Sequence, residues 1–189
     1  MAANHVLRYL QGTGDYGLDY RQGDGVRLAG YTDSAWAGCA SDRKNTSGCC
    51  FGLGSAVVSW LSRKQKSVAL SSSEAEYMAV SQASYEVIWL HKMLVGLFGQ
   101  RLRPIVIYCD NQSCIKLTEN PVFHDRSKHI EIRYHFIRDC VQRGVVKLEY
   151  ISTEEQVADI LTKSLPRGKH VFFRDKMGVV KNTFLSKRC

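Results

Sequence analysis

The alternation of apolar and polar positions predicts a β-rich first part of the chain. The stretch "VRLAGYTD", residues 26–33, is a strand-like run that ends on an acidic residue. Two further runs typical of strands, "CCFGLG" and "AVVSWLS", meet at Gly54 and Ser55, which predicts a hairpin or meander. A short helix over residues 2–10 precedes them and is closed by the turn-rich "QGTGDYG".

Helical spacing dominates the middle of the chain. Residues 74–98 are the longest periodic segment and predict a long helix. The positions that recur at helical spacing are Tyr77, Val80, Ser84, Val87, Ile88, His91, Leu94 and Phe98. After Pro104, the apolar run "IVIYCD" is typical of a buried parallel strand, and "VVKLEY" later predicts another strand.

Three more helices are predicted around these two strands. One begins at Asn111 and ends before Pro121, and a second covers "HDRSKHIEIRYHFIRDCVQRG" and is stopped by Gly144. The third is "TEEQVADILTKSL", with Thr153 as its N-cap, and the basic residues 166–189 are expected at the periphery. Because strands come first and alternate with helices later, the order predicts an α/β fold with a mixed sheet covered by helices.

Composition fits one globular domain and indicates a polyanionic partner. The chain has 189 residues, of which 44% are hydrophobic and 23% charged, enough to bury a core. Its formal net charge of +8 and its pI of about 9.2 favour nucleic acid, and a solvated basic surface is the alternative. No apolar run approaches the length of a membrane span, and the first residues lack the apolar core of a secretory signal.

Cysteine usage disfavours a structural zinc site. The seven cysteines are odd in number and include no C-x-x-C pair. A reducing compartment is therefore expected.

Two acidic residues end strands that should be close in space. Asp33 closes the first strand-like run and is followed by small residues, and Asp110 closes "IVIYCD". Ligands gather at the carboxyl ends of strands in such sheets, so the two carboxylates are candidates for one site. The alternative for Asp110 is helix capping, because it directly precedes the expected helix "NQSCIKL".

Two further acidic residues lie on helices among apolar neighbours. Ser71 with Glu74 and Ser73 with Glu76 both match the S-x-x-E capping box, but one helix end needs only one such pair. If Ser71 and Glu74 close the helix, Glu76 lies on the sheet-facing stripe, where a carboxylate needs a counter-charge or a metal. Asp159 lies between apolar residues of the last predicted helix, and a buried, salt-bridged or partly exposed Asp is the alternative there.

Taken together, this acidic set on strand, helix, strand and helix resembles the active site of ribonucleases H. The stretches "YTDSAWAGCASDRKNTSG", "VSWLSRKQKSVALSSSEAEYMA", "IYCDNQSCIKLTENPVFHDRSKHIEIRYHFIRD" and "ISTEEQVADILTKSL" are similar to the ribonuclease H region of copia-type LTR retrotransposon Pol polyproteins. The resemblance covers residues 29–165. The opening "AANHVLRYLQGTGDYGL" resembles the end of the reverse transcriptase segment that precedes this domain in those polyproteins.

The resemblance implies a fold and a domain organisation. It implies a ribonuclease H-like α/β fold with a mixed five-stranded sheet flanked by helices. Residues 1–25 would be the end of a reverse transcriptase or connection-like segment, residues 26–165 the ribonuclease H domain, and residues 166–189 a basic C-terminal tail.

The resemblance also implies the catalytic residues. Asp33 matches the Asp of "YTD", Glu76 the Glu of "AEYMA", Asp110 the Asp of "DN" and Asp159 the closing Asp of "QVAD", each as a catalytic residue and metal ligand. Two Mg²⁺ ions are expected, with Mn²⁺ as a possible substitute, and a site made of carboxylates suits an ion that prefers oxygen ligands. Many enzymes of this fold carry a His before the last Asp, whereas "EYISTEEQVAD" has none.

The expected partner is an RNA–DNA hybrid, with the polymerase segment of reverse transcriptase as a second partner if the chain is part of a polyprotein. Basic residues in "SRKQKS" and "DRSKHIEIR" would contact phosphates, and polar residues near the strand ends would sense the 2′-hydroxyl. Plain solvated surface is the alternative for the basic residues. The candidates are Ser34, Arg63, Lys64, Lys66, Asn111, Gln112, Arg126, Lys128 and Arg133.

The combined expectation is a metal-dependent endonuclease that hydrolyses the RNA strand of RNA–DNA hybrids during retrotransposon reverse transcription. The alternative is a catalytically weak or silent domain derived from a retrotransposon that binds nucleic acid or protein. The four intact carboxylates favour the enzyme. The expected location is intracellular, in cytoplasmic virus-like particles or in the nucleus, with no membrane partner.

Overall fold

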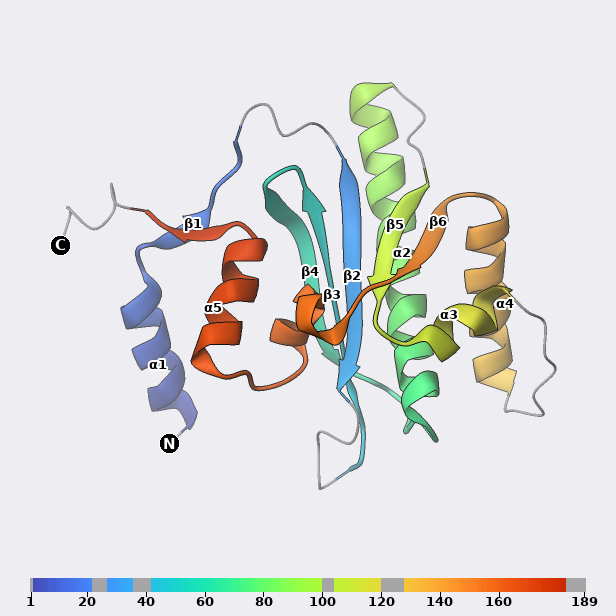
Figure 1. The fold of residues 1–189 in the computed structure, drawn as a ribbon, viewed down its shortest axis with the longest axis horizontal. Helices are drawn as coiled ribbons and strands as arrows, with labels where there is room; N and C mark the ends of the chain where they lie inside the picture. Colours follow the sequence, from blue (N-terminus) through green and yellow to red (C-terminus); the bar gives the residue numbers. More distant parts are fainter. Residues whose placement is uncertain (1, 22–26, 36–41, 100–103, 120–127, 183–189) are drawn as a thin grey trace.

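A mixed five-stranded sheet forms the centre of the molecule, in the order β4-β3-β2-β5-β6 (Figure 1). The computed structural model describes residues 2–21, 27–35, 42–99, 104–119 and 128–182. The strands are β2 (Leu28–Ala35), β3 (Thr46–Leu53), β4 (Ala56–Lys64), β5 (Ile105–Cys109) and β6 (Val146–Tyr150). Neighbours among β2, β3 and β4 pair antiparallel, whereas β5 pairs parallel with both β2 and β6. The predicted hairpin and mixed sheet are therefore confirmed.

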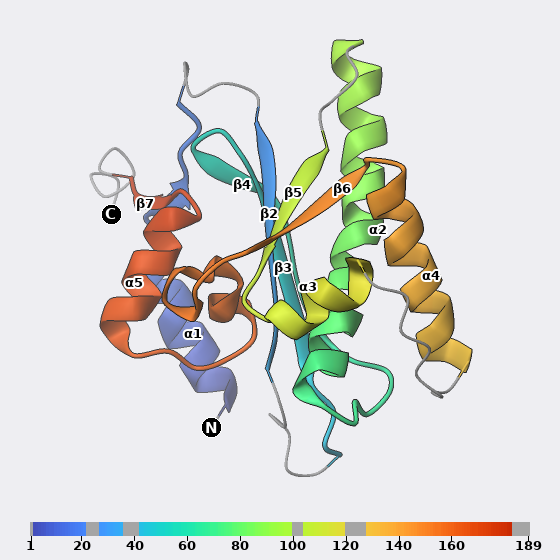
Figure 2. The same ribbon diagram turned by 45° about the vertical axis from the view of Figure 1, so that its right-hand side comes forward.

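Helices cover both faces of this sheet (Figures 1 and 2). The α-helices are α1 (Ala2–Thr13), α2 (Ser72–Phe98), α3 (Gln112–Glu119), α4 (Lys128–Gln142) and α5 (Arg167–Lys176), and two 3₁₀ helices are η1 (Thr153–Glu155) and η2 (Val157–Leu161). The helix α2 lies along one face with α4 beside it, and η2 and α5 lie on the other. In the described part of the chain, no helix is both long and apolar enough to cross a membrane.

The main core lies between α2 and the sheet. Ala83, Val87 and Leu90 of α2 pack with Phe51 of β3 and Ile107 of β5, and all five are buried. The side of α2 that carries Val80 and Val87 is the apolar side predicted from the sequence. This packing fixes where α2 begins relative to the ends of β2 and β5.

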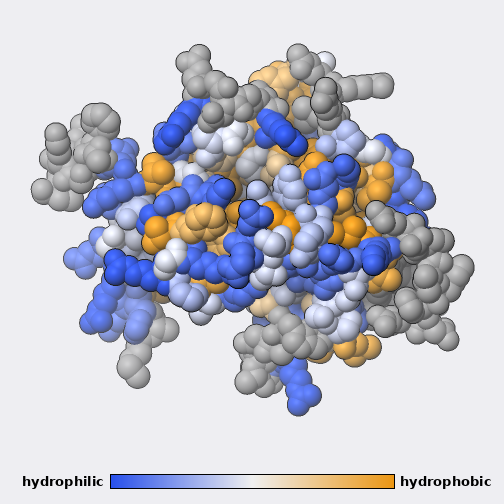
Figure 3. Space-filling view, in the orientation of Figure 1, coloured by the Kyte–Doolittle hydropathy of each residue, from blue (hydrophilic) through white to orange (hydrophobic). Residues whose placement is uncertain are grey.

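A second core lies on the opposite face, under α5. Phe173 of α5 and Met177, which directly follows α5, pack with Cys50 of β3, Val57 of β4 and Val157 of η2. The expectation that the basic segment after residue 165 is peripheral is wrong for its described part. Asp175 and Lys176 are exposed, while Phe173 and Met177 complete this core. Figure 3 shows mostly hydrophilic side chains over this side of the molecule, with apolar areas between them.

The two ends of the described chain are joined by a small sheet of their own. Strand β1 (Tyr16–Leu18) pairs antiparallel with β7 (Val179–Lys181). The Asp15 carboxylate forms an ion pair with Lys181 Nζ at 3.0 Å. Residues before and after the five-stranded sheet are thereby held side by side.

The prediction of a last α-helix in "TEEQVADILTKSL" is wrong, because this segment forms the two 3₁₀ helices η1 and η2 instead. Gln156 separates the two with an extended backbone, at φ −71° and ψ 95°. Its side chain donates to the Thr32 carbonyl at 3.0 Å and accepts from the Ala158 amide at 3.3 Å. These bonds to a buried Gln replace the continuous helical ladder. Thr153 is also not an N-cap, because Ser152 occupies that position and makes no side-chain capping bond.

Gly48 of β3 allows η2 to approach the sheet closely. A Cβ at this position would lie 2.6 Å from Thr162 Cγ2 and 3.0 Å from Leu161 Cβ. Both contacts are far shorter than normal carbon–carbon packing distances. The absence of a side chain at Gly48 therefore decides how closely the segment that carries Asp159 lies against β3.

Gly48→Ala should lower the free energy of unfolding by about 1–3 kcal/mol, because the added methyl overpacks the interface with η2. Urea denaturation followed by circular dichroism measures this change. Gly52→Ala, in the same strand, is the matched control, since the nearest atom to its Cβ is 3.9 Å away and its stability should stay close to that of the original chain. Equal loss in both variants would contradict the close approach of η2.

Candidate active site

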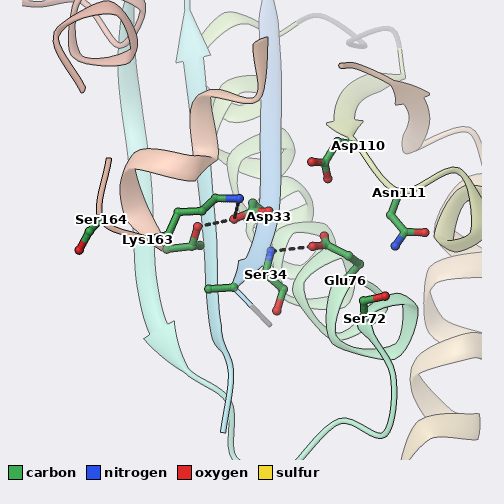
Figure 4. Close-up of a pocket in the computed structure, with 10 residues that line it drawn as sticks. Asp33, Ser34, Ser72, Glu76, Asp110, Asn111, Lys163 and Ser164 are labelled. Carbon is green, nitrogen blue, oxygen red and sulfur yellow. Dashed lines mark hydrogen bonds and ion pairs between the residues drawn. The ribbon is translucent and has the colours of Figure 1, made fainter. Parts of the chain in front are cut away.

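Four acidic side chains from separate elements meet at the carboxyl ends of β2 and β5. Asp33 lies near the end of β2, Asp110 directly follows β5, Glu76 lies in the second turn of α2, and Asp159 lies in η2. Carboxylate oxygens of Asp33, Asp110 and Asp159 lie within 4.8 Å of one another, and those of Glu76 and Asp110 are equally close. Figure 4 shows Asp33, Glu76 and Asp110 around one space. The parallel pairing of β2 with β5 brings Asp33 and Asp110 together.

Asp33 is buried, and two residues that follow η2 support its carboxylate. Asp33 is only 2% exposed. The Thr162 hydroxyl donates a hydrogen bond to Oδ2, and Lys163 Nζ lies 3.6 Å from the same oxygen. Burial raises the pKa of Asp33, and these two contacts offset that effect only in part. The strand continues past Asp33 to Ala35, so the carboxylate lies inside the sheet end rather than after it.

Glu76 is available because a different residue closes the start of α2. Ser71 is the N-cap and accepts from the Glu74 amide at 3.2 Å, while the Glu74 carboxylate accepts from the Leu70 amide at 2.9 Å. Of the two S-x-x-E pairs, Ser71 with Glu74 therefore closes the helix, with the Glu74 side chain on the Leu70 amide rather than on the Ser71 amide of a standard capping box. Glu76 then points toward the sheet, as the sequence predicts.

The Glu76 carboxylate is half satisfied. Its Oε1 accepts from the Ser34 amide at 2.9 Å, and its Oε2 has no hydrogen-bond partner among the described residues. Glu76 is only 6% exposed. Burial, and next the negative charge of Asp33, hold the pKa of Glu76 well above its usual value. An oxygen in this state lacks the partner that a buried charge requires.

Asp110 is not a helix cap, and that alternative is wrong. The cap of α3 is Asn111, whose Oδ1 accepts from the Cys114 amide at 2.9 Å. Asp110 Oδ2 instead accepts from the Thr153 hydroxyl at 3.0 Å, which joins the end of β5 to η1. Asp110 is thereby held toward the other carboxylates and remains partly accessible.

Asp159 is buried and paired with a lysine one turn later. Lys163 Nζ lies 2.9 Å from Asp159 Oδ1. Burial raises the pKa of Asp159, Lys163 opposes this, and the negative charge of Asp33 adds to it. Partial burial would lower the pKa of Lys163, but the charges of Asp33 and Asp159 outweigh it and raise that pKa. The salt-bridged Asp considered from the sequence is therefore present, within the acidic cluster.

An open cleft gives access to these groups. Its volume is about 570 Å³, and its lining includes Ser34, Asp110 and Asn111, as well as Thr162 and Lys163. No histidine is among the residues that line it in the described part of the chain. The predicted contacts Ser34 and Asn111 therefore reach the cleft, while Gln112 lies exposed beside Asn111.

Most of the predicted basic residues gather in a second hollow, called here the basic groove. Its volume is about 410 Å³, and Arg63, Lys64, Lys66 and Arg133 line it, from β4, the segment after it and α4. Lys64 also pairs with Asp42 at 2.6 Å. Arg126 and the side chain of Lys128 lie outside the described residues.

Gln65 connects the basic groove with the cleft. Its amide nitrogen donates to Ser34 Oγ at 3.1 Å, Ser47 Oγ at 2.8 Å and the Ala75 carbonyl at 3.0 Å. Ser34 in turn holds Glu76 through its amide. The basic groove and the acidic cluster are thus fixed relative to each other by one buried side chain.

Several of these residues were not singled out from the sequence. Lys163 follows Asp159 by four residues, a spacing that would have indicated the ion pair. Thr162 and Thr153 carry no such signal, because each reaches an acidic residue far away in the chain. Gln65 stands within the basic stretch "SRKQKS", where its neighbours' charges gave no sign of a buried role.

Comparison with known proteins identifies the fold and the sequence relatives of the chain. No protein-family model matches the chain. The chain is 46% identical over 95% of its length to the retrovirus-related Pol polyprotein from transposon RE2 of Arabidopsis thaliana. It is 42% identical over 96% of its length to the one from transposon TNT 1-94 of Nicotiana tabacum. It spans only 12% and 14% of the lengths of these two relatives.

Solved structures agree on the architecture. The N-terminal RNase H domain of rv2228c from Mycobacterium tuberculosis superposes with a TM-score of 0.54 at 11% identity, over 79% of this chain and 96% of that one. LC11-RNase H1, solved in complex with RNA/DNA hybrid, gives a TM-score of 0.53 at 13% identity, over 72% of this chain and 94% of that one. At such identities the likeness shows the fold, which is ribonuclease H-like. The sequence relatives are retrovirus-related Pol polyproteins of copia-type transposons, and this chain is homologous to a segment of them and has a ribonuclease H-like fold.

Proposed function

We propose that this chain is a divalent-metal-dependent ribonuclease H that hydrolyses the RNA strand of an RNA–DNA hybrid during reverse transcription of a retrotransposon. One observation carries the proposal: Glu76 Oε2 is buried without a partner beside Asp33 and Asp110, at an open cleft. Burying a carboxylate oxygen in this way is costly unless a cation reaches it. The family and the fold are consistent with this reading.

The residues present fit a divalent cation that prefers oxygen ligands. Asp33, Asp110 and Asp159 offer oxygens within 4.8 Å of one another, and Glu76 adds another beside Asp110. Mg²⁺ takes carboxylates and waters, and Mn²⁺ accepts the same ligands. When bound, two such ions would neutralise charge on the attacking water and on the leaving oxygen.

The chain's own residues hold the carboxylates for this chemistry. The Ser34 amide fixes Glu76 Oε1, while Oε2 has no hydrogen-bond partner among the described residues. The Thr162 hydroxyl orients Asp33, and the Thr153 hydroxyl orients Asp110. Lys163 supplies one positive charge where acidic groups would otherwise only repel one another. Each carboxylate is therefore positioned before any ion or substrate arrives.

Binding of the hybrid is assigned to the basic groove and the cleft. The side chains of Arg63, Lys66 and Arg133 would neutralise phosphates of one strand. Ser34 and Asn111, at the cleft, would meet the sugar of the strand to be cut, where a 2′-hydroxyl distinguishes RNA from DNA. The complex of LC11-RNase H1 with RNA/DNA hybrid supports this choice of substrate.

Cleavage of a labelled RNA–DNA hybrid tests the proposal directly. The original chain should cut the RNA strand with Mg²⁺ or Mn²⁺, and should leave duplex DNA of the same sequence intact. Asp110→Asn should lose about 100-fold or more of this rate, the order expected when a group that stabilises transition-state charge is removed. Its metal-free melting temperature should stay equal or rise, because like-charge repulsion is relieved while Asn111 still caps α3.

Asp139→Asn is the matched control for this substitution. Asp139 lies exposed on α4 in an ion pair with Arg143, and such pairs contribute little. It should cleave like the original chain. Full activity in Asp110→Asn would defeat the metal-site assignment. A chain that binds hybrid but never cuts it with either ion would instead support a silent binding domain.

Stabilisation by Mg²⁺ should increase as pH rises from the ordinary carboxylate pKa of about 4 through the raised pKa values of the site. Because the pKa values of Asp33, Glu76 and Asp159 are raised, their protonated forms stabilise the metal-free fold at low pH. That contribution is lost as pH rises through the raised values, and bound cations then supply the missing counter-charge. Melting curves with EDTA or with Mg²⁺ across this range measure the difference. Glu76→Gln should flatten it, and a shift independent of pH in the original chain would contradict the shared site.

Replacing Arg63 and Lys66 together by Ala should flatten the salt dependence of hybrid binding. Each lost phosphate contact should reduce the log–log slope by about one unit, so the pair should reduce it by about two. Fluorescence anisotropy at several salt concentrations measures the slope. Lys147 and Lys181, which form ion pairs with Glu149 and Asp15, provide the control double replacement with the same loss of charge. Equal flattening in both would mean that net charge, not the basic groove, determines binding.

A further inference from the structure

The sulfur atom of Cys109 lies beside the acidic cluster. Sγ of Cys109 and carboxylate oxygens of Glu76 and Asp110 all lie within 4.8 Å of one another. Cys109 is the last residue of β5 and is fully buried. These three residues are called here the thiol–carboxylate site. Asp110 belongs both to this site and to the all-oxygen group that it forms with Asp33 and Asp159.

A second observation indicates that the thiol–carboxylate site is suited to a ligand. Glu76 is more than nine-tenths buried, and its Oε2 has no hydrogen-bond partner among the described residues. Figure 4 shows its carboxylate between the Ser34 backbone and Asp110. The carboxylate that has this unpartnered oxygen therefore also offers an oxygen within 4.8 Å of the sulfur.

The surroundings of the sulfur favour its role as an electron donor. The Asn111 amide donates to Cys109 Sγ at 3.5 Å, and the Cys109 thiol donates to the Asn111 carbonyl at 3.9 Å. The hydrogen bond from the amide would stabilise the thiolate that a bound cation requires.

We propose that Glu76, Cys109 and Asp110 bind a thiophilic divalent cation such as Zn²⁺ or Cd²⁺. This site would prefer different ions from those that the all-oxygen group prefers. Ions of this kind take sulfur and oxygen together in tetrahedral geometry, with the sulfur and an oxygen about 3.6 Å apart. Donor atoms within 4.8 Å can reach that spacing through a small movement of the partly exposed Asp110. A water would complete the fourth position, and the thiol proton would pass to solvent.

Occupation of the thiol–carboxylate site has a consequence for magnesium. Mg²⁺ prefers oxygen ligands and gains nothing from the sulfur, whereas Zn²⁺ and Cd²⁺ do. Since Glu76 and Asp110 would both be withdrawn, a thiophilic ion should inhibit cleavage supported by Mg²⁺. This inhibition rests on the proposed function, but binding of the ion at the site does not.

Titration with CdCl₂ tests the site without any enzymatic reaction. Every protein carries Cys39→Ser and Cys189→Ser, two cysteines outside the described residues, so that the signal reports the remaining thiols. The parent should develop the ultraviolet sulfur-to-cadmium absorption, saturating at one ion. Cys109→Ser should lose this absorption, and Cys140→Ser, at a buried thiol of α4, should keep it. Loss in Cys140→Ser with retention in Cys109→Ser would overturn the proposal.

A second variant keeps the test decisive if Cys109→Ser fails to fold. Glu76→Gln should keep the sulfur absorption of the bound ion but weaken Cd²⁺ affinity by about tenfold or more, since one of three protein ligands loses its charge. Unchanged affinity in this variant would overturn the proposal.

The cleavage assay then adds the inhibitory effect. In the parent, Cd²⁺ should inhibit Mg²⁺-supported cleavage at concentrations about tenfold lower than in Cys109→Ser, and equal inhibition would overturn the inference. If the parent shows no cleavage at all, the proposed function fails, yet the absorption titration still decides the cation site.

Discussion

Repulsion between buried carboxylates is the constraint on which the rest of the site depends. Asp33, Glu76 and Asp159 are all nearly inaccessible to solvent, and burial raises the pKa of each. A fold gains nothing for its own stability by collecting such groups. The parallel pairing of β2 with β5 nevertheless brings two of the carboxylate-bearing chain segments side by side, and the neighbouring elements hold the other two against them.

The surrounding contacts show how the cluster is tolerated. A backbone amide satisfies one oxygen of Glu76, hydroxyl groups satisfy Asp33 and Asp110, and Lys163 provides a single positive charge between Asp33 and Asp159. That is partial compensation, because one lysine faces several acidic groups. The uncompensated negative charge of the cluster therefore favours binding of a cation. The electrostatics of the folded chain thus support its proposed chemistry.

Sequence patterns predicted those parts whose cause is local. The long helix α2, the β3–β4 hairpin and the strand before Asp110 follow from periodicity and turn residues, and all three are confirmed. The segment around Gln156 was predicted as an α-helix with Thr153 as its N-cap, but a bond from the Gln156 side chain to the Thr32 carbonyl of β2 replaces the helix. The packing of Phe173 was hidden by the basic residues around it. Contacts such as that between Thr162 and Asp33 join residues distant in the chain, so no local pattern could reveal them.

The pairing of β1 with β7 has a consequence for dividing the chain. A shorter protein limited to residues 26–165 would keep all four carboxylates and every motif that carries the family resemblance. It would nevertheless lose Phe173 and Met177, leaving Cys50, Val57 and Val157 open to water on one face of the sheet. Exposed apolar surface of this kind promotes association between molecules. Such a fragment would be expected to aggregate when expressed, so its inactivity would say nothing about the carboxylates.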